Sequence, residues 1–100
     1  MPKILLKNIE YLERMKDDVK IHIEGASPVL TVMSLKRILE KLPAADFKRI
    51  HRSIIVPVRK VQSLQNRKIK FSSIELPVSG SYVDEVKLAK KLVRKQVYSE

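Results

Sequence analysis

The stretch Phe47-Lys48-Arg49-Ile50-His51-Arg52-Ser53-Ile54-Ile55-Val56 decides how this chain has to fold. Its large apolar residues are expected in the core: Phe47, Ile50, Ile54, Ile55 and Val56. Its three cations, Lys48, Arg49 and Arg52, cannot all follow them, because Lys and Arg are almost never buried without a partner. The stretch therefore predicts a backbone pinned by the core with cations held at its edge, which suits contact with a polyanion.

The composition indicates one globular domain of 100 residues with a basic surface. Hydrophobic residues make up 44% of the chain, enough for a core that rests on Ile, Leu and Val. The net charge of +10 favours DNA, RNA or an anionic membrane surface as partner, and the layout of that charge favours nucleic acid. A basic surface kept only for solubility is the alternative.

Several kinds of chemistry are excluded by what the sequence lacks. There is no cysteine for disulfides, thiol catalysis or cysteine zinc sites. His22 and His51 lack metal-ligand spacing, and no P-loop or G-x-S-x-G occurs, so we expect no enzyme activity, metal or cofactor. No apolar run approaches the ~20 residues that span a bilayer, and no signal peptide is visible. We therefore expect a cytoplasmic protein without a membrane partner.

Apolar and polar residues alternate in the first part of the chain as in half-buried strands. Residues 19–24 alternate without a fault, which turns His22 toward solvent, and residues 9–13 and 29–32 flank them as further strands. Ser34 is a good N-cap, and apolar residues follow at helical spacing up to Pro43. The pattern predicts a meander of antiparallel hairpins followed by a short helix at about 34–42.

The second part continues with strands and ends in a helix. The run at 54–56 is β-branched and apolar, which predicts a buried strand, and residues 68–71 and 74–78 form a hairpin. An apolar stripe with a lysine-rich opposite face predicts a C-terminal helix at about 81–96, with Ser81 and Asp84 as a weak capping pair. The expected fold is mainly β: elongated antiparallel β-meander sheets with two helices.

The cations are distributed one-sidedly along the sequence. Eight of them and no acid occur between residues 47 and 71, which predicts a basic patch with salt-sensitive affinity for phosphates. Among these cations Arg52 is the best candidate for reading sequence, because its planar fork can pair with guanine O6 and N7.

Four blocks of the sequence resemble the LytTR (LytR/AlgR-type) DNA-binding domain of bacterial response regulators. They are Leu30-Thr31-Val32-Met33-Ser34-Leu35-Lys36, Leu39-Glu40-Lys41-Leu42-Pro43, Phe47-Lys48-Arg49-Ile50-His51-Arg52-Ser53 and Leu76-Pro77-Val78-Ser79-x-x-Tyr82. The blocks follow the family's order and spacing, and the likeness covers nearly all of residues 1–100. This resemblance implies a mainly antiparallel β fold that binds double-stranded DNA in a sequence-specific manner and regulates transcription.

The resemblance also implies where DNA is bound. Loops would enter successive major grooves, usually on direct repeats, with a dimer on the DNA as a further implication. The chain would be the output domain of a two-component response regulator, cut from a longer protein that carries a receiver domain. Carried over by position, the contacts are Arg14, Lys16 and Asp18 in a first loop, His51, Arg52 and Ser53 in a second, and Ser79, Gly80 and Ser81 in a third. Lys48 and Arg49, beside the second loop, are expected to contact phosphates or water.

The chain departs from the family pattern at three places. Pro57 stands where Asn is common, so the strand there is expected to bend or to lie at a sheet edge. Asp18 stands where Tyr is common and would repel phosphate. Gly80 and Ser81 leave the third loop without Arg or Lys.

Two other functions fit a small basic β domain. An RNA-binding β module is disfavoured because stacking aromatics are scarce and fall mostly at core or end positions: Tyr11, Phe47, Phe71, Tyr82 and Tyr98. A protein-interaction module would dock an acidic partner on the basic face, and its binding would survive nuclease treatment.

Overall fold

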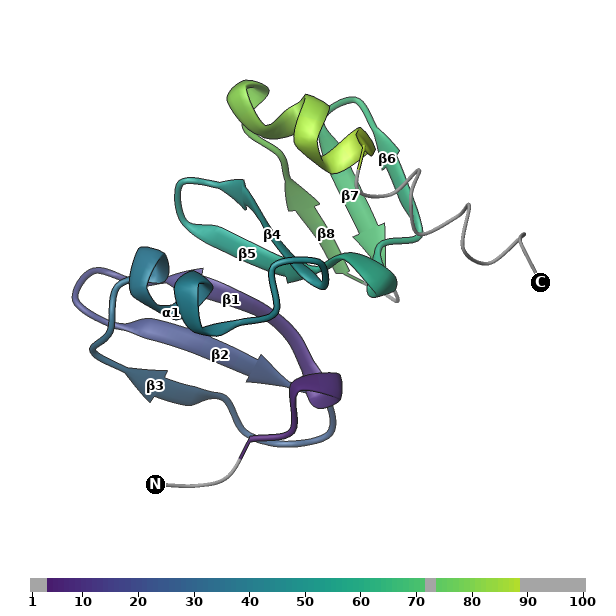
Figure 1. The fold of residues 1–100 in the computed structure, drawn as a ribbon. Helices are drawn as coiled ribbons and strands as arrows, with labels where there is room; N and C mark the ends of the chain where they lie inside the picture. Colours follow the sequence, from purple (N-terminus) through teal and green to yellow (C-terminus); the bar gives the residue numbers. More distant parts are fainter. Residues whose placement is uncertain (1–3, 72–73, 89–100) are drawn as a thin grey trace.

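Two antiparallel sheets make up most of the fold in the computed structural model, which describes residues 4–71 and 74–88 (Figure 1). The larger sheet has five strands in the order β3-β2-β1-β5-β4. Their bounds are β1 Ile9–Arg14, β2 Val19–Ile23, β3 Val29–Thr31, β4 Phe47–His51 and β5 Ile54–Pro57. The predicted meander of hairpins and the mainly β fold class are confirmed.

The smaller sheet has three strands and lies beside the β4–β5 hairpin rather than extending the larger sheet (Figure 1). Its order is β6-β7-β8, with bounds Ser63–Gln65, Lys68–Phe71 and Ile74–Pro77. The described residues also form three short 3-10 helices: η1 Leu6–Asn8 before β1, η2 Val58–Lys60 between β5 and β6, and η3 Gly80–Tyr82 after β8. The whole measures 38 × 30 × 27 Å, so the elongation is moderate.

Helix α1 spans Leu35–Lys41 and confirms the first predicted helix. The Ser34 hydroxyl accepts a hydrogen bond from the Arg37 N–H at 3.2 Å, which satisfies one of the free donors at the helix start. Leu35 and Ile38 are buried against the larger sheet, and the chain leaves the helix just before Pro43.

A C-terminal helix is present and begins at Val83, two residues after its predicted start. Gly80–Tyr82 form the 3-10 turn η3 instead, so Ser81 is not the N-cap and the expected Ser81–Asp84 capping pair is wrong. Residues 83–88 are helical, and Val86 is buried. The remainder of the prediction, residues 89–96, lies outside the described residues.

Strand β5 is buried on both of its faces. Ile55 is fully buried in a cluster with helix α1 and strands β1 and β2. Ile54 and Val56 point the other way, into a second cluster with the smaller sheet and Val86. Phe47 joins the first cluster and Ile50 the second, so all five apolar residues expected in the core are there. The continuous apolar run follows from this two-sided burial.

Pro57 ends a strand in the interior of the larger sheet, so the edge position is wrong. The ladder between β1 and β5 stops at Ile55, and the chain turns into η2 directly after Pro57. The missing N–H therefore falls where β1 makes no ladder bond, and the sheet accommodates Pro57 as the last residue of the strand.

His22 is not simply turned to solvent. Its ring stacks on Tyr11 with centroids 4.0 Å apart, and Nε2 lies 3.2 Å from Oε1 of Glu13. Burial, followed by repulsion from Glu13 and Glu10, raises the pKa of the Tyr11 hydroxyl. The alternation of residues 19–24 gave the correct face, but this face is partly covered by the neighbouring strand.

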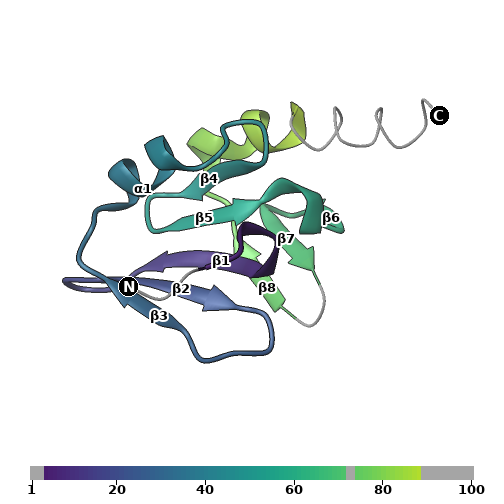
Figure 2. The same cartoon turned by 60° about the horizontal axis from the view of Figure 1, so that its bottom comes forward.

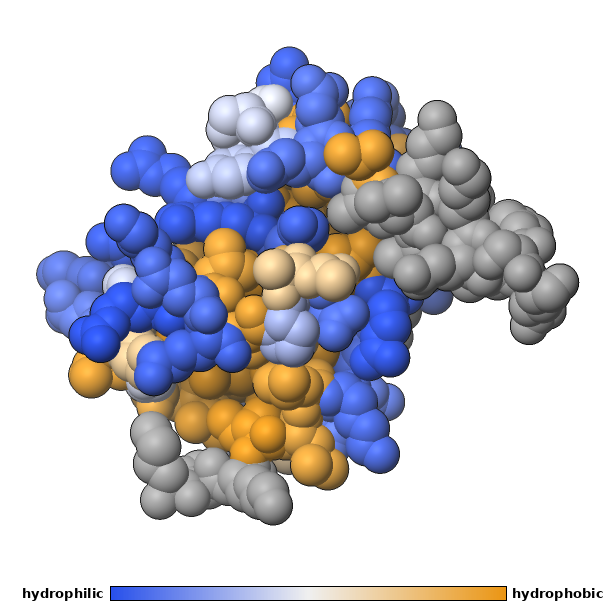
Figure 3. Space-filling model, viewed as in Figure 1, coloured by the Kyte–Doolittle hydropathy of each residue, from blue (hydrophilic) through white to orange (hydrophobic). Residues whose placement is uncertain are grey.

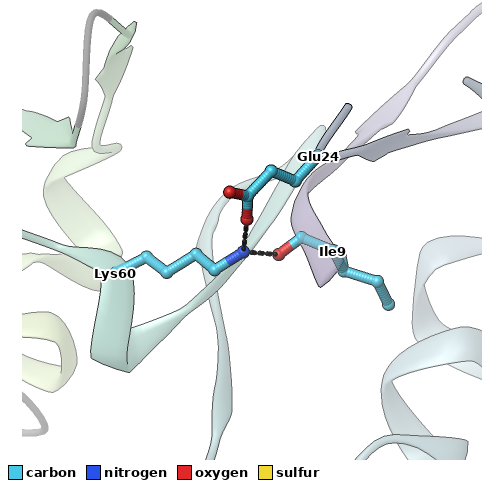
Figure 4. A network of polar contacts seen from close by, with 3 residues as sticks. All are labelled: Ile9, Glu24 and Lys60. Atoms are coloured by element: carbon cyan, nitrogen blue, oxygen red, sulfur yellow. Dashed lines mark hydrogen bonds and ion pairs between the residues drawn. The ribbon is translucent and has the colours of Figure 1, made fainter. Parts of the chain in front are cut away.

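Lys60 ties the start of β1 to the end of β2 (Figure 4). Its Nζ donates to the Ile9 carbonyl oxygen at 3.0 Å and lies 3.5 Å from Oε2 of Glu24. The Lys60 side chain is 26% exposed and the Glu24 side chain 67% exposed, so water screens the ion pair more than the bond to the carbonyl.

We predict that Lys60→Met lowers the free energy of unfolding by about 1 kcal/mol, because the Ile9 carbonyl loses its donor. Glu24→Gln should change it by less than about 0.5 kcal/mol, since an exposed ion pair contributes little. Urea unfolding followed by circular dichroism measures both. A larger loss for Glu24→Gln than for Lys60→Met would contradict this assignment.

Candidate nucleic-acid interface

The three segments proposed as DNA-contacting loops lie at one end of the fold, which we call the loop end: residues 14–18, 51–53 and 79–81. The β1–β2 and β4–β5 turns point to the same side in both ribbon views (Figures 1 and 2). The Arg14 N–H donates to the Ser53 carbonyl oxygen at 2.7 Å, which joins the first loop to the second. The Ser79 N–H donates to the Ile50 carbonyl oxygen at 2.8 Å, which joins the third loop to the base of the second.

The second loop is a two-residue turn, Arg52–Ser53, in a hairpin with a β-bulge. The register passes from Arg49↔Ile55 to His51↔Ile54, so Ile50 is the extra residue on β4. Its side chain is fully buried, while its carbonyl oxygen holds the third loop. In a regular ladder the Ile50 carbonyl would bond within the sheet. The bulge instead leaves it available to the third loop.

The guanidinium of Arg49 stabilises this turn through two hydrogen bonds. Nε donates to the His51 carbonyl oxygen at 3.3 Å, and Nη2 donates to the Arg52 carbonyl oxygen at 2.5 Å. Two carbonyls that face the same way along a tight turn suit the rigid fork of an arginine. We expected the Arg49 side chain to contact DNA phosphates or water. In the structure its guanidinium is directed at backbone carbonyls of the turn.

His51 also fixes the turn. Its Nδ1 accepts the Ser53 N–H at 3.1 Å. A neutral imidazole with Nδ1 as acceptor carries its proton on Nε2, so the half-buried ring keeps one N–H for an outside acceptor. Arg52, at the tip of the turn, is exposed.

The first and third loops differ in the side chains that they expose. Arg14 and Lys16 are exposed, whereas Asp18 is half-buried and its carbonyl oxygen closes the turn by accepting the Met15 N–H at 2.7 Å. In the third loop the Ser79 and Ser81 hydroxyls lie 3.5 Å apart, and Ser79 is half-buried.

Buried residues on both sides hold the third loop. Val78 precedes it and Val86 follows it, and both are in the second core cluster. The Tyr82 N–H donates to the Ser79 carbonyl oxygen at 2.8 Å, which closes η3. The loop is therefore short and anchored at both ends.

The cations of residues 47–71, an interval without acidic residues, do not form the single basic patch that was expected. Lys60 contacts Ile9, at one end of β1, whereas the loop end contacts Arg14, at the other end, about 17 Å away along a six-residue strand. Arg59, also on η2, is therefore remote from the loop end. Lys48 lies on the edge strand β4, paired with Val56, and is half-buried. Polar side chains nevertheless make up most of the surface on the side where the β1–β2 and β4–β5 turns lie (left in Figure 3).

Arg67 is a cation at the loop end that the sequence did not place there. It belongs to the β6–β7 turn, and its carbonyl oxygen accepts the Val78 N–H at 2.7 Å, one residue before the third loop. The signal in the sequence was the Asn66-Arg67 turn itself, but its position beside residues 79–81 depends on the packing of the smaller sheet.

Other kinds of site are not formed by the described residues. No group of three or more His, Asp or Glu side chains there could hold a metal ion. No helix in the described ranges is long and apolar enough to cross a membrane.

Comparison with known proteins agrees with this geometry. The model of the LytTr DNA-binding domain matches residues 1–91. Among solved structures, a protein described as the LytTr DNA-binding domain of a methyl-accepting/DNA response regulator from Bacillus cereus superposes with a TM-score of 0.76. That match has 23% sequence identity and covers 86% of this chain and 84% of the other, which shows a shared fold. No curated protein matches the chain. The chain belongs to the LytTR DNA-binding domain family, a non-catalytic family whose members bind DNA and regulate transcription.

Proposed function

We propose that this domain reads specific sequences of double-stranded DNA by placing its three loops in successive major grooves. The observation that carries the proposal is the pair of backbone hydrogen bonds from Arg14 to Ser53 and from Ser79 to Ile50. They join the loops into one rigid end, so little ordering cost remains to be met when DNA binds.

The side chains of the loop end fit distinct tasks in such a complex. Arg52 is exposed at the tip of the braced turn, where its fork suits guanine O6 and N7. The Nε2–H of His51 is a donor for a base edge or a phosphate beside it. Arg14 and Lys16 are exposed cations for the phosphate backbone. Arg49 acts as a positioning residue that holds the turn, and Lys48 is left as a phosphate contact.

The remaining loop residues contribute shape more than charge. Ser53, Ser79 and Ser81 carry hydroxyls that can donate to phosphate or base edges. Gly80 offers only backbone groups within the 3-10 turn η3, and Asp18 contributes through the backbone that closes the first loop.

We further propose that the domain serves transcription regulation as the output domain of a two-component response regulator. The similar Bacillus cereus domain, which is described as part of a response regulator, supports this context. A receiver domain in the full-length protein and a dimer on direct repeats follow from the same proposal.

The RNA-binding alternative loses support from the placement of the aromatic rings. Of the three aromatic side chains whose burial is described, Phe47 is buried in the core, Tyr11 stacks on His22, and Tyr82 packs against the second cluster. None of these three is an open platform for a base. Competition between duplex DNA and single-stranded RNA separates the two functions.

We predict that the domain selects a defined motif from a random pool of duplexes, with affinity that falls steeply as salt rises. Fluorescence anisotropy at several salt concentrations measures the affinity of the selected duplex against a scrambled one. Recovery of no motif would contradict sequence-specific reading. Capture of a protein partner that survives nuclease treatment would favour the interaction module.

We predict that Arg52→Ala weakens binding to the selected duplex by about 1–3 kcal/mol and relaxes discrimination at one base pair. Arg59→Ala is the matched control, because Arg59 is exposed on η2, away from the loop end. Anisotropy titrations on single-base variants of the duplex measure both effects. A loss that is equal on all duplexes would show that Arg52 touches only phosphate.

We predict that Arg49→Lys reduces discrimination between the selected duplex and its closest variants by roughly fivefold, about 1 kcal/mol. Lysine keeps the charge but cannot hold two turn carbonyls with one rigid fork. The salt dependence of binding should stay unchanged in the same titrations. If Arg49 is only a phosphate contact, lysine will preserve discrimination instead.

A further inference from the structure

We propose that Arg67, from the β6–β7 turn, contacts a DNA phosphate beside the third loop and supplies the cation that the loop itself lacks. This inference rests on the proposed function, because it adds a fourth segment to the same DNA-binding end. Three observations carry it: the conformation of Arg67, the place of its guanidinium over Gly80, and the lack of a carboxylate partner among residues 4–71 and 74–88.

Arg67 has a left-handed backbone conformation, which is unfavourable for most residues other than glycine. The turn has φ values of 51° at Asn66 and 59° at Arg67, both left-handed, in a two-residue hairpin loop between Gln65 and Lys68. Such turns favour Asn at the first position and Gly at the second. Arginine in place of glycine costs on the order of 1 kcal/mol there. A residue that strains its own turn is a reasonable candidate for a functional role rather than a structural one.

The guanidinium of Arg67 lies directly over the third loop. A Cβ built on Gly80 would lie 3.5 Å from Nη1 and 3.6 Å from Cζ of Arg67. The Val78 N–H is bound to the Arg67 carbonyl oxygen, and the next residue, Ser79, is bound to Ile50. The Arg67 backbone is therefore held at the loop end through the same series of backbone bonds that joins the three loops.

Among the residues that the structure describes, no carboxylate pairs with the guanidinium of Arg67. The ion pair found among residues 4–71 and 74–88 joins Lys60 to Glu24, and the Glu13 carboxylate lies against the His22 ring, so neither carboxylate is paired with Arg67. Arg67 is also exposed. In this respect it differs from Arg49 and Lys60, whose side chains bind backbone carbonyls. A guanidinium that has no acidic partner in the described ranges, carried on a fixed backbone, suits an anionic oxygen outside the chain.

The position of Arg67 fits a contact with phosphate better than a contact with a base edge. Arg67 is carried by a hairpin outside the three loops, and its guanidinium rests on the back of Gly80 rather than at a loop tip. A contact of this kind adds affinity on every sequence and counterion release on binding, without discrimination between bases.

The test compares Arg67→Gly, Arg67→Gln and Arg59→Gln on the selected duplex and on a scrambled duplex over a series of salt concentrations. Arg67→Gly removes the guanidinium and the strain together, so its melting temperature should equal or exceed that of the wild type. Arg67→Gln keeps a side chain of intermediate length if glycine alters the turn. Arg59→Gln removes the same charge from an exposed site away from the loop end.

We expect both Arg67 variants to bind roughly eightfold more weakly at 0.1 M salt, by the same factor on both duplexes. The slope of log K against log salt should fall in magnitude by about 1, whereas Arg59→Gln should leave it unchanged. An unchanged slope in the Arg67 variants, or an equal change in Arg59→Gln, would overturn the proposal. If the wild type binds no duplex, the proposed function fails, and this contact fails with it. If Arg52→Ala weakens binding but the Arg67 variants bind as the wild type does, only the role of Arg67 is overturned.

Discussion

Burial of β5 on both faces is the constraint on which the rest of the structure depends. Because Ile55 packs toward α1 and Ile54 and Val56 toward the smaller sheet, the strand has to lie between two cores. The hairpin that leads into it is then fixed in position, and so is the turn at its tip. The position of the β1–β2 turn is fixed as well, because β1 pairs with β5. The third loop is fixed through its bond to Ile50. The loop end is thus a consequence of core packing.

The cations of this domain have different tasks, which its net charge of +10 conceals. Lys60 holds the start of β1, and Arg49 holds two carbonyls of the Arg52–Ser53 turn. Both are therefore part of the scaffold. Arg52 and Arg67 are exposed at the loop end. Charge along the sequence predicts attraction to a polyanion, but the division between scaffold and contact is set by which carbonyls lie within reach of each side chain.

Local patterns were sufficient to predict most of the fold. The run at residues 54–56, the Ser34 cap and the alternation at residues 19–24 each depend on neighbours in the sequence, and each is confirmed. The start of the last helix was misplaced because a 3-10 turn obeys nearly the same spacing. The placement of Arg67 over Gly80 and the bond from Ser79 to Ile50 join segments that are far apart in the sequence. Such contacts are decided by how sheets pack, so no local pattern predicts them.

The way in which the loops are joined bears on how one frame can serve different DNA sequences. Both bonds between loops run from backbone to backbone, from Arg14 to Ser53 and from Ser79 to Ile50. Any residue but proline can donate such a bond, so side chains at the tips can change without moving the loops. The core holds the backbone through Ile50, Val78 and Val86, which point inward. Under the proposed function, support and reading are therefore carried by different atoms, and we expect a substitution at Arg52 to alter base reading while the frame that presents it stays in place.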